Sequence, residues 1–162
     1  MRQKVQAIIK QACAKAGIEV ELKTVTASVY FSSDVTNPDT FGKFFADIEM
    51  YLNTRYGTDP DRFMQQWVSW EICQKSNNWQ WQNKSRWSSP EYDKAFRAAE
   101  VELDPVKRAA LLIKCNDMAI QNFVVIPVVA RPTTTGISNK LTVELTGWDN
   151  NTWDIQNWFK EG

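Results

Sequence analysis

The first apolar residues of the chain recur at the spacing of one helix face. They fall at i, i+3, i+4, i+7, i+8 and i+11, which predicts a helix of about four turns; they are Val5, Ile8, Ile9, Ala12, Cys13 and Ala16. Gly17 is the expected end, because helices commonly finish on a left-handed residue that glycine adopts freely. Ile18, Val20 and Leu22 then alternate with charged residues, which predicts a strand with one covered face.

A second alternating segment, 47–53, predicts another strand, and the region before it, 26–47, is loop-like with a turn at 37–39. After that strand, Asp59 fits a helix N-cap and Pro60 a first helical residue. The helix is expected to carry Phe63, Met64, Trp67 and Val68. Residues 74–89 mix polar and aromatic side chains without a period, which predicts an ordered loop.

Two later helices have clear starting signals. Residues 88–91 fit a capping box before Tyr92, Ala95, Phe96 and Ala99. Asp104 and Pro105 begin another helix, whose broad apolar face is expected to be mostly buried. The apolar run 123–129 has strand length, and Pro127 limits it to a sheet edge or a crossover. Together these elements predict an α/β fold with a central mixed sheet and helices on both faces.

Composition narrows the chemistry that the chain can perform. It has no histidine, which excludes Ser-His-Asp and Cys-His catalytic sets and removes the commonest metal ligand. The carboxylate pairs Asp59/Asp61 and Glu100/Glu102 are two residues apart and do not face each other on a helix. The chain also lacks phosphate-binding and calcium-loop motifs. We therefore expect no enzymatic activity, no metal and no cofactor.

Charge and hydropathy limit the classes of partner that we expect for the chain. The 19 basic and 19 acidic residues cancel, which argues against nucleic-acid binding, since that normally needs a basic excess. No apolar run approaches the roughly 18 residues of a membrane span, so we expect no direct membrane insertion. The start of the chain is amphipathic and does not have the pattern of an export signal.

Aromatic and thiol side chains supply the remaining candidate chemistry. The eight tryptophans gather in the windows 67–87 and 148–158. Trp79, Trp81 and Asn83 place rings beside amides, which suits a small-molecule or sugar pocket but equally suits a core closed under a loop. The three cysteines are widely spaced and odd in number, which favours small buried hydrophobes over a disulfide or metal set.

Several stretches, in order, resemble the C-terminal part of bacterial extracytoplasmic solute-binding proteins of the oligopeptide/dipeptide/nickel class (solute-binding family 5), which serve ABC importers. They are AGIEVEL (16–22), DPD (59–61), NKSRWSSPEYD (83–93), ELDPVKRAAL (102–111), VIPV (125–128), GWD (147–149) and Trp153. The resemblance covers nearly the whole chain. It implies one lobe of a two-lobed clamshell, with residues 1–130 forming the ligand-binding lobe without its first strand. Residues 131–162 would form the segment that returns to the other lobe.

The resemblance further implies non-catalytic capture of a solute and a periplasmic location. The full-length protein would have an inner-membrane ABC permease as its partner. This chain would be an excised piece of that protein. It places the segment before the Asp59 turn at the ligand cleft, together with Asn83 and the end of the last strand. Peptide binders of this class usually have an aspartate where this chain has Tyr56. The solute would be peptide-like, or neutral or anionic such as a glycoside. Tyr56 at this position, with Arg55 and Arg131 near it, favours the second class over a free peptide. The expected ligand-binding residues are Asn53, Thr54, Arg55, Tyr56, Trp79, Trp81, Asn83 and Arg131.

Two other functions stay open from the sequence. A hydrolytic domain would depend on Asp59 or Asp61. A protein-interaction module would use exposed tryptophans, because large exposed apolar side chains mark interfaces.

Overall fold

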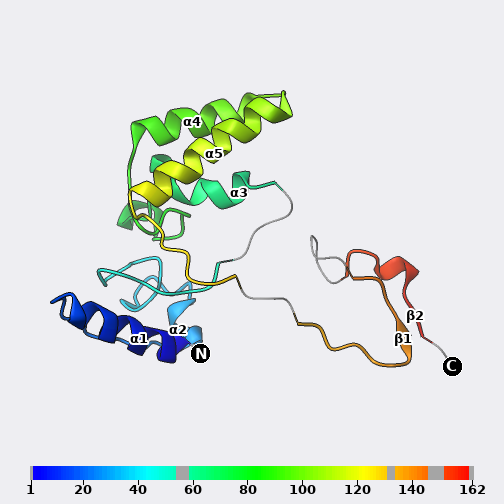
Figure 1. Ribbon diagram of the computed structural model, residues 1–162, viewed down its shortest axis with the longest axis horizontal. Coiled ribbons are helices and arrows are strands. Elements are labelled where there is room, and N and C mark those ends of the chain that lie inside the picture. The colour runs from blue at the N-terminus through cyan, green and yellow to red at the C-terminus, as the bar shows by residue number, and fades with distance from the viewer. Residues whose placement is uncertain (1, 54–58, 131–133, 146–151, 161–162) are drawn as a thin grey trace.

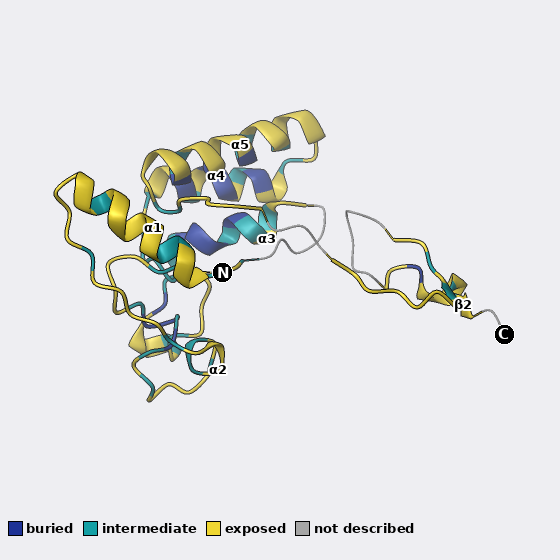
Figure 2. Cartoon of the chain, turned by 60° about the horizontal axis from the view of Figure 1, so that its bottom comes forward, coloured by how far each residue is buried: buried dark blue, intermediate teal, exposed yellow. Residues whose placement is uncertain are grey.

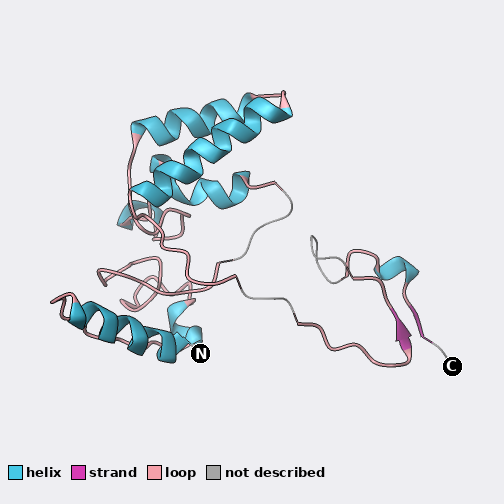
Figure 3. Ribbon diagram, in the orientation of Figure 1, coloured by secondary structure: helices cyan, strands magenta, loops and turns pink. Residues whose placement is uncertain are grey.

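The computed structural model describes residues 2–53, 59–130, 134–145 and 152–160, and these form a mainly helical structure (Figures 1 and 3). Helices α4 and α5 lie together above α3, while α1 and α2 lie below them in Figure 1. A small hairpin near the C-terminus lies apart from both groups. The α-helices are α1 (Arg2–Lys15), α2 (Ala27–Tyr30), α3 (Asp61–Met64), α4 (Pro90–Val101) and α5 (Pro105–Gln121). The short 3₁₀ helices are η1 (Gln65–Trp67), η2 (Ser69–Glu71), η3 (Lys75–Asn77) and η4 (Ile155–Asn157).

The predicted central mixed sheet is wrong. The sheet in the described residues is an antiparallel pair, β1 (Leu141–Thr142) and β2 (Phe159–Lys160), in which Leu141 faces Lys160. The segments 18–22, 47–53 and 123–129 follow irregular or extended paths without a β-ladder. An alternating pattern specifies an extended backbone, but a strand also needs a neighbour that shares its hydrogen bonds. The predicted covered face is missing as well, since Ile18 is 57% exposed.

Both later helices begin as the sequence predicts, at or within one residue of the expected position. The hydroxyl of Ser89 accepts a hydrogen bond from the Tyr92 backbone N–H, so the cap is Ser89, one residue after the expected Ser88. The Asp104 carboxylate accepts hydrogen bonds from the backbone N–H groups of Val106 and Lys107. Proline follows each cap at the first helical position, where its missing N–H costs nothing.

The main core lies where α4 and α5 pack on α3 and η1 (Figure 2). The Tyr92 ring is fully buried there, and its hydroxyl donates to the Met64 carbonyl oxygen at 2.6 Å. The buried face of α5 is narrower than the sequence predicts, since Val106 is 77% exposed and Ile113 is 60% exposed. The buried residues of this core are Met64, Trp67, Val68, Tyr92, Ala95, Phe96, Ala99, Leu112, Cys115 and Ala119.

Helix α1 has the predicted extent and the predicted stop. Gly17 adopts φ +79°, its N–H bonds to the Ala14 carbonyl, and the Ile18 N–H bonds to the Cys13 carbonyl; this is the Schellman arrangement that glycine favours. No residue of α1 is buried, and Figure 2 shows the helix mostly exposed. Helix α3 begins at Asp61, one residue later than predicted, because Pro60 occupies the N-cap.

Candidate functional site

Two loops that are distant in the sequence line a partly open pocket of about 190 Å³. One loop follows α2 and spans 31–42, and the other follows η3 and spans 78–84. The lining combines aromatic rings with amide, hydroxyl and charged groups. Its residues are Phe31, Ser32, Ser33, Asp34, Val35, Thr40, Phe41, Gly42, Asn78, Trp79, Gln80, Gln82 and Lys84.

The backbone has an unusual conformation at Asn78 and Trp79, two neighbouring residues of the pocket lining. Asn78 and Trp79 both lie in the left-handed region, with φ of +52° and +61°. For a side chain such as tryptophan this conformation costs about 1–2 kcal/mol, so the surrounding contacts must hold it. Such conformations concentrate at sites where the chain needs a particular side-chain direction.

Gly42 allows the two loops to meet. A Cβ at this position would lie 2.6 Å from the backbone oxygen of Trp79, well inside van der Waals contact. Glycine therefore lets the 31–42 loop approach the Trp79 backbone, and both residues line the pocket.

Arg86 links chain segments that adjoin the two loops. Its Nε donates to the Cys73 carbonyl oxygen at 3.0 Å, and a terminal nitrogen donates to the Lys43 carbonyl oxygen. Its guanidinium also lies 5.1 Å from the centre of the Trp79 ring, within the range of a cation–π contact. Arg86 thus orients the Trp79 ring without itself lining the pocket.

An aromatic cluster supports the first loop. The Tyr30 ring lies 4.9 Å from Phe31, 5.8 Å from Phe41 and 6.1 Å from Tyr51, measured between ring centres. The Tyr30 hydroxyl donates to the Glu49 carboxylate at 2.7 Å. Burial and this acidic neighbour raise the pKa of Tyr30 above its usual value. Phe31 and Phe41, which both line the pocket, therefore pack against the Tyr30 ring.

The pocket lining includes one negatively charged and one positively charged side chain. The Asp34 carboxylate accepts hydrogen bonds from the Thr36 hydroxyl and backbone N–H, at 2.7 and 2.8 Å, both on Oδ1. These bonds hold the pKa of Asp34 below its usual value, so it is ionised near neutral pH. The Lys84 ammonium lies 4.5 Å from the centre of the Phe41 ring and donates to the Trp81 carbonyl oxygen. The two charges balance, and both groups are already partly engaged by the chain.

Of the residues expected to bind a ligand, Trp79 is the one that the structure brings to this pocket. Asn53 donates a hydrogen bond to the Gln66 side chain near η1, and the Trp81 ring is 44% exposed. Asn83 is fully buried away from the pocket. Thr54, Arg55, Tyr56 and Arg131 lie outside the described residues.

The polar groups of Asn83 form hydrogen bonds inside the protein. Its side-chain nitrogen donates to the carbonyl oxygens of Val68 and Trp87, at 3.0 and 2.8 Å. Its side-chain oxygen accepts from the Ser85 hydroxyl. Its backbone N–H and carbonyl bond to the chain at Glu71 and Cys73. Asn83 therefore anchors the loop on which Trp79 and Lys84 stand, and its amide is used inside the protein.

Sequence reasoning missed most of the pocket. The amides of Asn78, Gln80 and Gln82 flank Trp79 in the sequence, so the mixed aromatic and amide composition of 74–89 was a usable signal for them. The opposite wall, from Phe31 to Gly42, gave no signal beyond a turn at 37–39. Its role depends on a contact between loops about forty residues apart, which no local pattern encodes.

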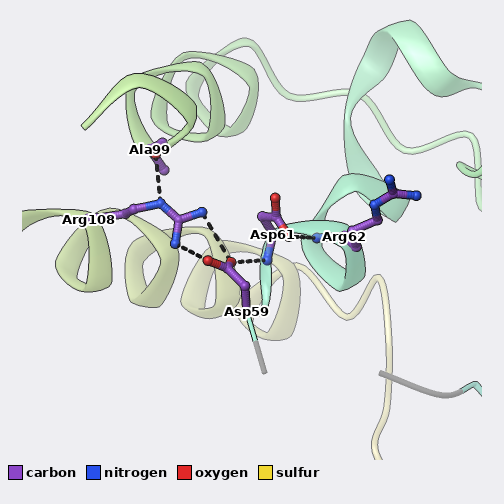
Figure 4. Close-up of polar contacts among 5 residues, drawn as sticks. All are labelled: Asp59, Asp61, Arg62, Ala99 and Arg108. Atoms are coloured by element: carbon purple, nitrogen blue, oxygen red, sulfur yellow. Dashed lines mark hydrogen bonds and ion pairs between the residues drawn. The ribbon is translucent and has the colours of Figure 1, made fainter. Parts of the chain in front are cut away.

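The carboxylates considered for hydrolysis lie elsewhere (Figure 4). Both oxygens of Asp59 contact the Arg108 guanidinium, at 2.5 and 3.1 Å, and Oδ1 also accepts the Asp61 N–H. The Arg108 hydrogen bond is the main reason that the pKa of Asp59 is lowered. Asp61 accepts a hydrogen bond from the Arg62 N–H. The Asp59 carboxylate is thus an ionised partner in a link between the start of α3 and α5.

Other features of the described residues concern metal binding, membrane insertion and a second groove. No group of three or more His, Cys, Asp or Glu side chains in that part of the chain is placed to hold a metal ion. No helix there is long and apolar enough to cross a membrane. A larger and more open, mainly apolar groove of about 410 Å³ lies between α3 and α5, where it is lined by Met64, Ala109, Leu112 and Ile113 among others.

Comparisons of the chain with protein-family models, with curated proteins and with solved structures find no match. The resemblance to solute-binding proteins therefore has no support from these comparisons. The geometry of the pocket between the two loops carries the functional argument.

Proposed function

We propose that the chain captures a small solute non-covalently in the pocket between residues 31–42 and 78–84. The observation that carries this proposal is Trp79, which lines the pocket in a left-handed conformation and is flanked by amide side chains. A flat ring supplies shape, and amides supply direction, which is the composition typical of small-molecule sites. The Arg86 contact and the close approach at Gly42 preorganise that wall.

The two charged groups among the described lining residues are both engaged by the chain itself, which supports a binding role for the pocket. Asp34 is ionised and bonded to Thr36, and Lys84 is engaged with Phe41 and a carbonyl oxygen. The Asp59 carboxylate is held by Arg108 outside the pocket. Solute capture also agrees with the resemblance of the sequence to importer binding proteins. The proposal therefore includes a periplasmic location and an ABC permease as partner.

A thermal-shift screen with a matched pair of variants tests the proposal. The panel contains D-glucose, D-galactose, D-xylose, sodium benzoate, citrate and L-alanyl-L-alanine. A solute at 100 times its Kd stabilises the folded chain by about 2.7 kcal/mol, which raises the Tm measurably. We expect at least one panel member to do so in the wild type and in Trp153→Leu, but not in Trp79→Leu.

Trp153 is the matched control, because its ring is 44% exposed and lies in the C-terminal segment. Circular dichroism without solute checks that both variants keep the wild-type helix content. The proposal fails if no panel member raises the Tm, or if Trp79→Leu retains the full stabilisation.

A further inference from the structure

We infer that the captured solute is a neutral carbohydrate of monosaccharide size. This inference rests on the proposed function and adds the chemical class of the ligand. It follows from the size of the pocket, the kind of polar group that lines it, and the balance of its charges.

The size of the pocket sets the first limit. Its volume of about 190 Å³ is below the roughly 300 Å³ at which pockets for drug-sized ligands begin. A volume of this size excludes an oligopeptide or an oligosaccharide and suits a ligand built on a single ring.

The lining matches the two faces of a sugar ring. Trp79 is one of the lining residues and carries a flat apolar indole, and one face of a pyranose ring presents mainly C–H groups that suit such a surface. Asn78, Gln80 and Gln82 offer primary amides, which donate and accept at once. A hydroxyl group also donates and accepts, so neighbouring hydroxyls can pair with one amide in both directions. Carboxylate ligands accept only and would leave the amide oxygens without partners.

The charges favour a ligand without net charge. An anionic solute would meet the ionised Asp34 carboxylate, and a cationic solute would meet the Lys84 ammonium. Lys84 is further committed to the Phe41 ring and the Trp81 carbonyl, which reduces its pull on an anion. Asp34 receives both Thr36 hydrogen bonds on Oδ1, and its carboxylate has capacity to accept from sugar hydroxyls as strong charge-assisted bonds.

Titration calorimetry with the full chain tests the inference. The probes are D-glucose, D-galactose, D-xylose, sodium benzoate and L-alanyl-L-alanine. We expect one of the three sugars to bind at least tenfold more tightly than benzoate or the dipeptide. Asp34→Asn and Gln80→Ala should each raise the Kd of that sugar by about tenfold, which corresponds to the loss of one good hydrogen bond.

Gln121→Ala is the control, because Gln121 is an exposed residue at the end of α5; it should leave the Kd unchanged. Asp34→Asn retains an oxygen for the Thr36 bonds, so the loop keeps its shape.

If benzoate or the dipeptide binds most tightly and Trp79→Leu abolishes that binding, capture stands and the carbohydrate inference is overturned. If no probe binds, both proposals fall. If the tightest sugar binds Asp34→Asn and Gln80→Ala as it binds the wild type, the inference is overturned.

Discussion

Arg108 on α5 binds both carboxylate oxygens of Asp59, at 2.5 and 3.1 Å, and so fixes the start of α3 to the helix pair (Figure 4). The same guanidinium donates through Nε to the Ala99 carbonyl near the end of α4, at 3.1 Å. One side chain therefore connects three helices at the edge of the core. Its partner Asp59 is 48% exposed, so solvent screens the pair and its contribution to stability is modest.

The first prediction concerns the ionisation of Asp59. Its pKa is lower in the folded chain than its usual value near 3.8, so the pair stabilises the fold above that pH. The contribution is lost as the pH falls below about 4 and the carboxylate is protonated. Arg108→Gln should raise the pKa of Asp59 towards 3.8, as measured by NMR titration of the carboxyl carbon. An unchanged pKa would contradict this role for Arg108, and Arg62→Gln serves as a control on the neighbouring surface.

The second prediction concerns the buried amide of Asn83. Asn83→Ala leaves the carbonyl oxygens of Val68 and Trp87 without their donor in a fully buried site. Losing such partners costs about 2–4 kcal/mol of unfolding free energy. Urea unfolding should show this loss, whereas Asn116→Ala on the exposed face of α5 should change stability by less than about 0.5 kcal/mol. Equal effects of the two substitutions would mean that Asn83 does not anchor the loop.

The third prediction concerns thiol reactivity. Cys73 and Cys115 are buried, and burial raises the pKa of both thiols, that of Cys115 to about 11. Cys13 is partly exposed on α1. Because the thiolate is the reactive form, Ellman's reagent should label one thiol per native chain, and Cys13→Ser should remove that reaction. Rapid labelling of two or three thiols without denaturant would contradict the packing around Cys73 and Cys115.

The fourth prediction separates the two loops that form the pocket. A methyl group at position 42 would lie 2.6 Å from the Trp79 oxygen, whereas one at position 136 would meet no atom within 4 Å. Gly42→Ala should therefore push the loops apart and weaken solute capture by at least tenfold. Gly136→Ala should leave capture unchanged. Indistinguishable affinities in these variants would show that the close approach at Gly42 is not needed for the site.

Features set by neighbouring residues could be predicted from the sequence. Ser89 and Asp104 cap helices through bonds to residues two or three positions away, and Gly17 ends α1 through its own φ. Burial was predicted for all three cysteines and is confirmed for Cys73 and Cys115, whereas Cys13 on α1 is partly exposed. For the two caps and for Gly17 the physical cause lies within a few residues of the position that shows it, whereas burial of a thiol is set by tertiary packing.

Features set by distant partners could not be predicted. Ile18, Val20 and Leu22 alternate as a strand would, but nothing local specifies the neighbour with which a strand must pair. Trp79 was recognised as a candidate because amides surround it in the sequence. Phe41 and Gly42 were missed, because their part in the pocket comes from packing against a loop that follows much later.

The most direct test of the central claim is a map of where a solute binds. A ¹H–¹⁵N NMR titration with the solute that raises the Tm most in the screen would follow every backbone amide and the tryptophan indoles, with Trp79→Phe used to assign the Trp79 indole. We predict saturable shifts at the Trp79 indole and at amides in 31–42 and 78–84, with the α3–α5 groove unaffected. Shifts confined to Met64, Ala109 and Ile113, or spread evenly over the chain, would contradict capture in the pocket between the two loops.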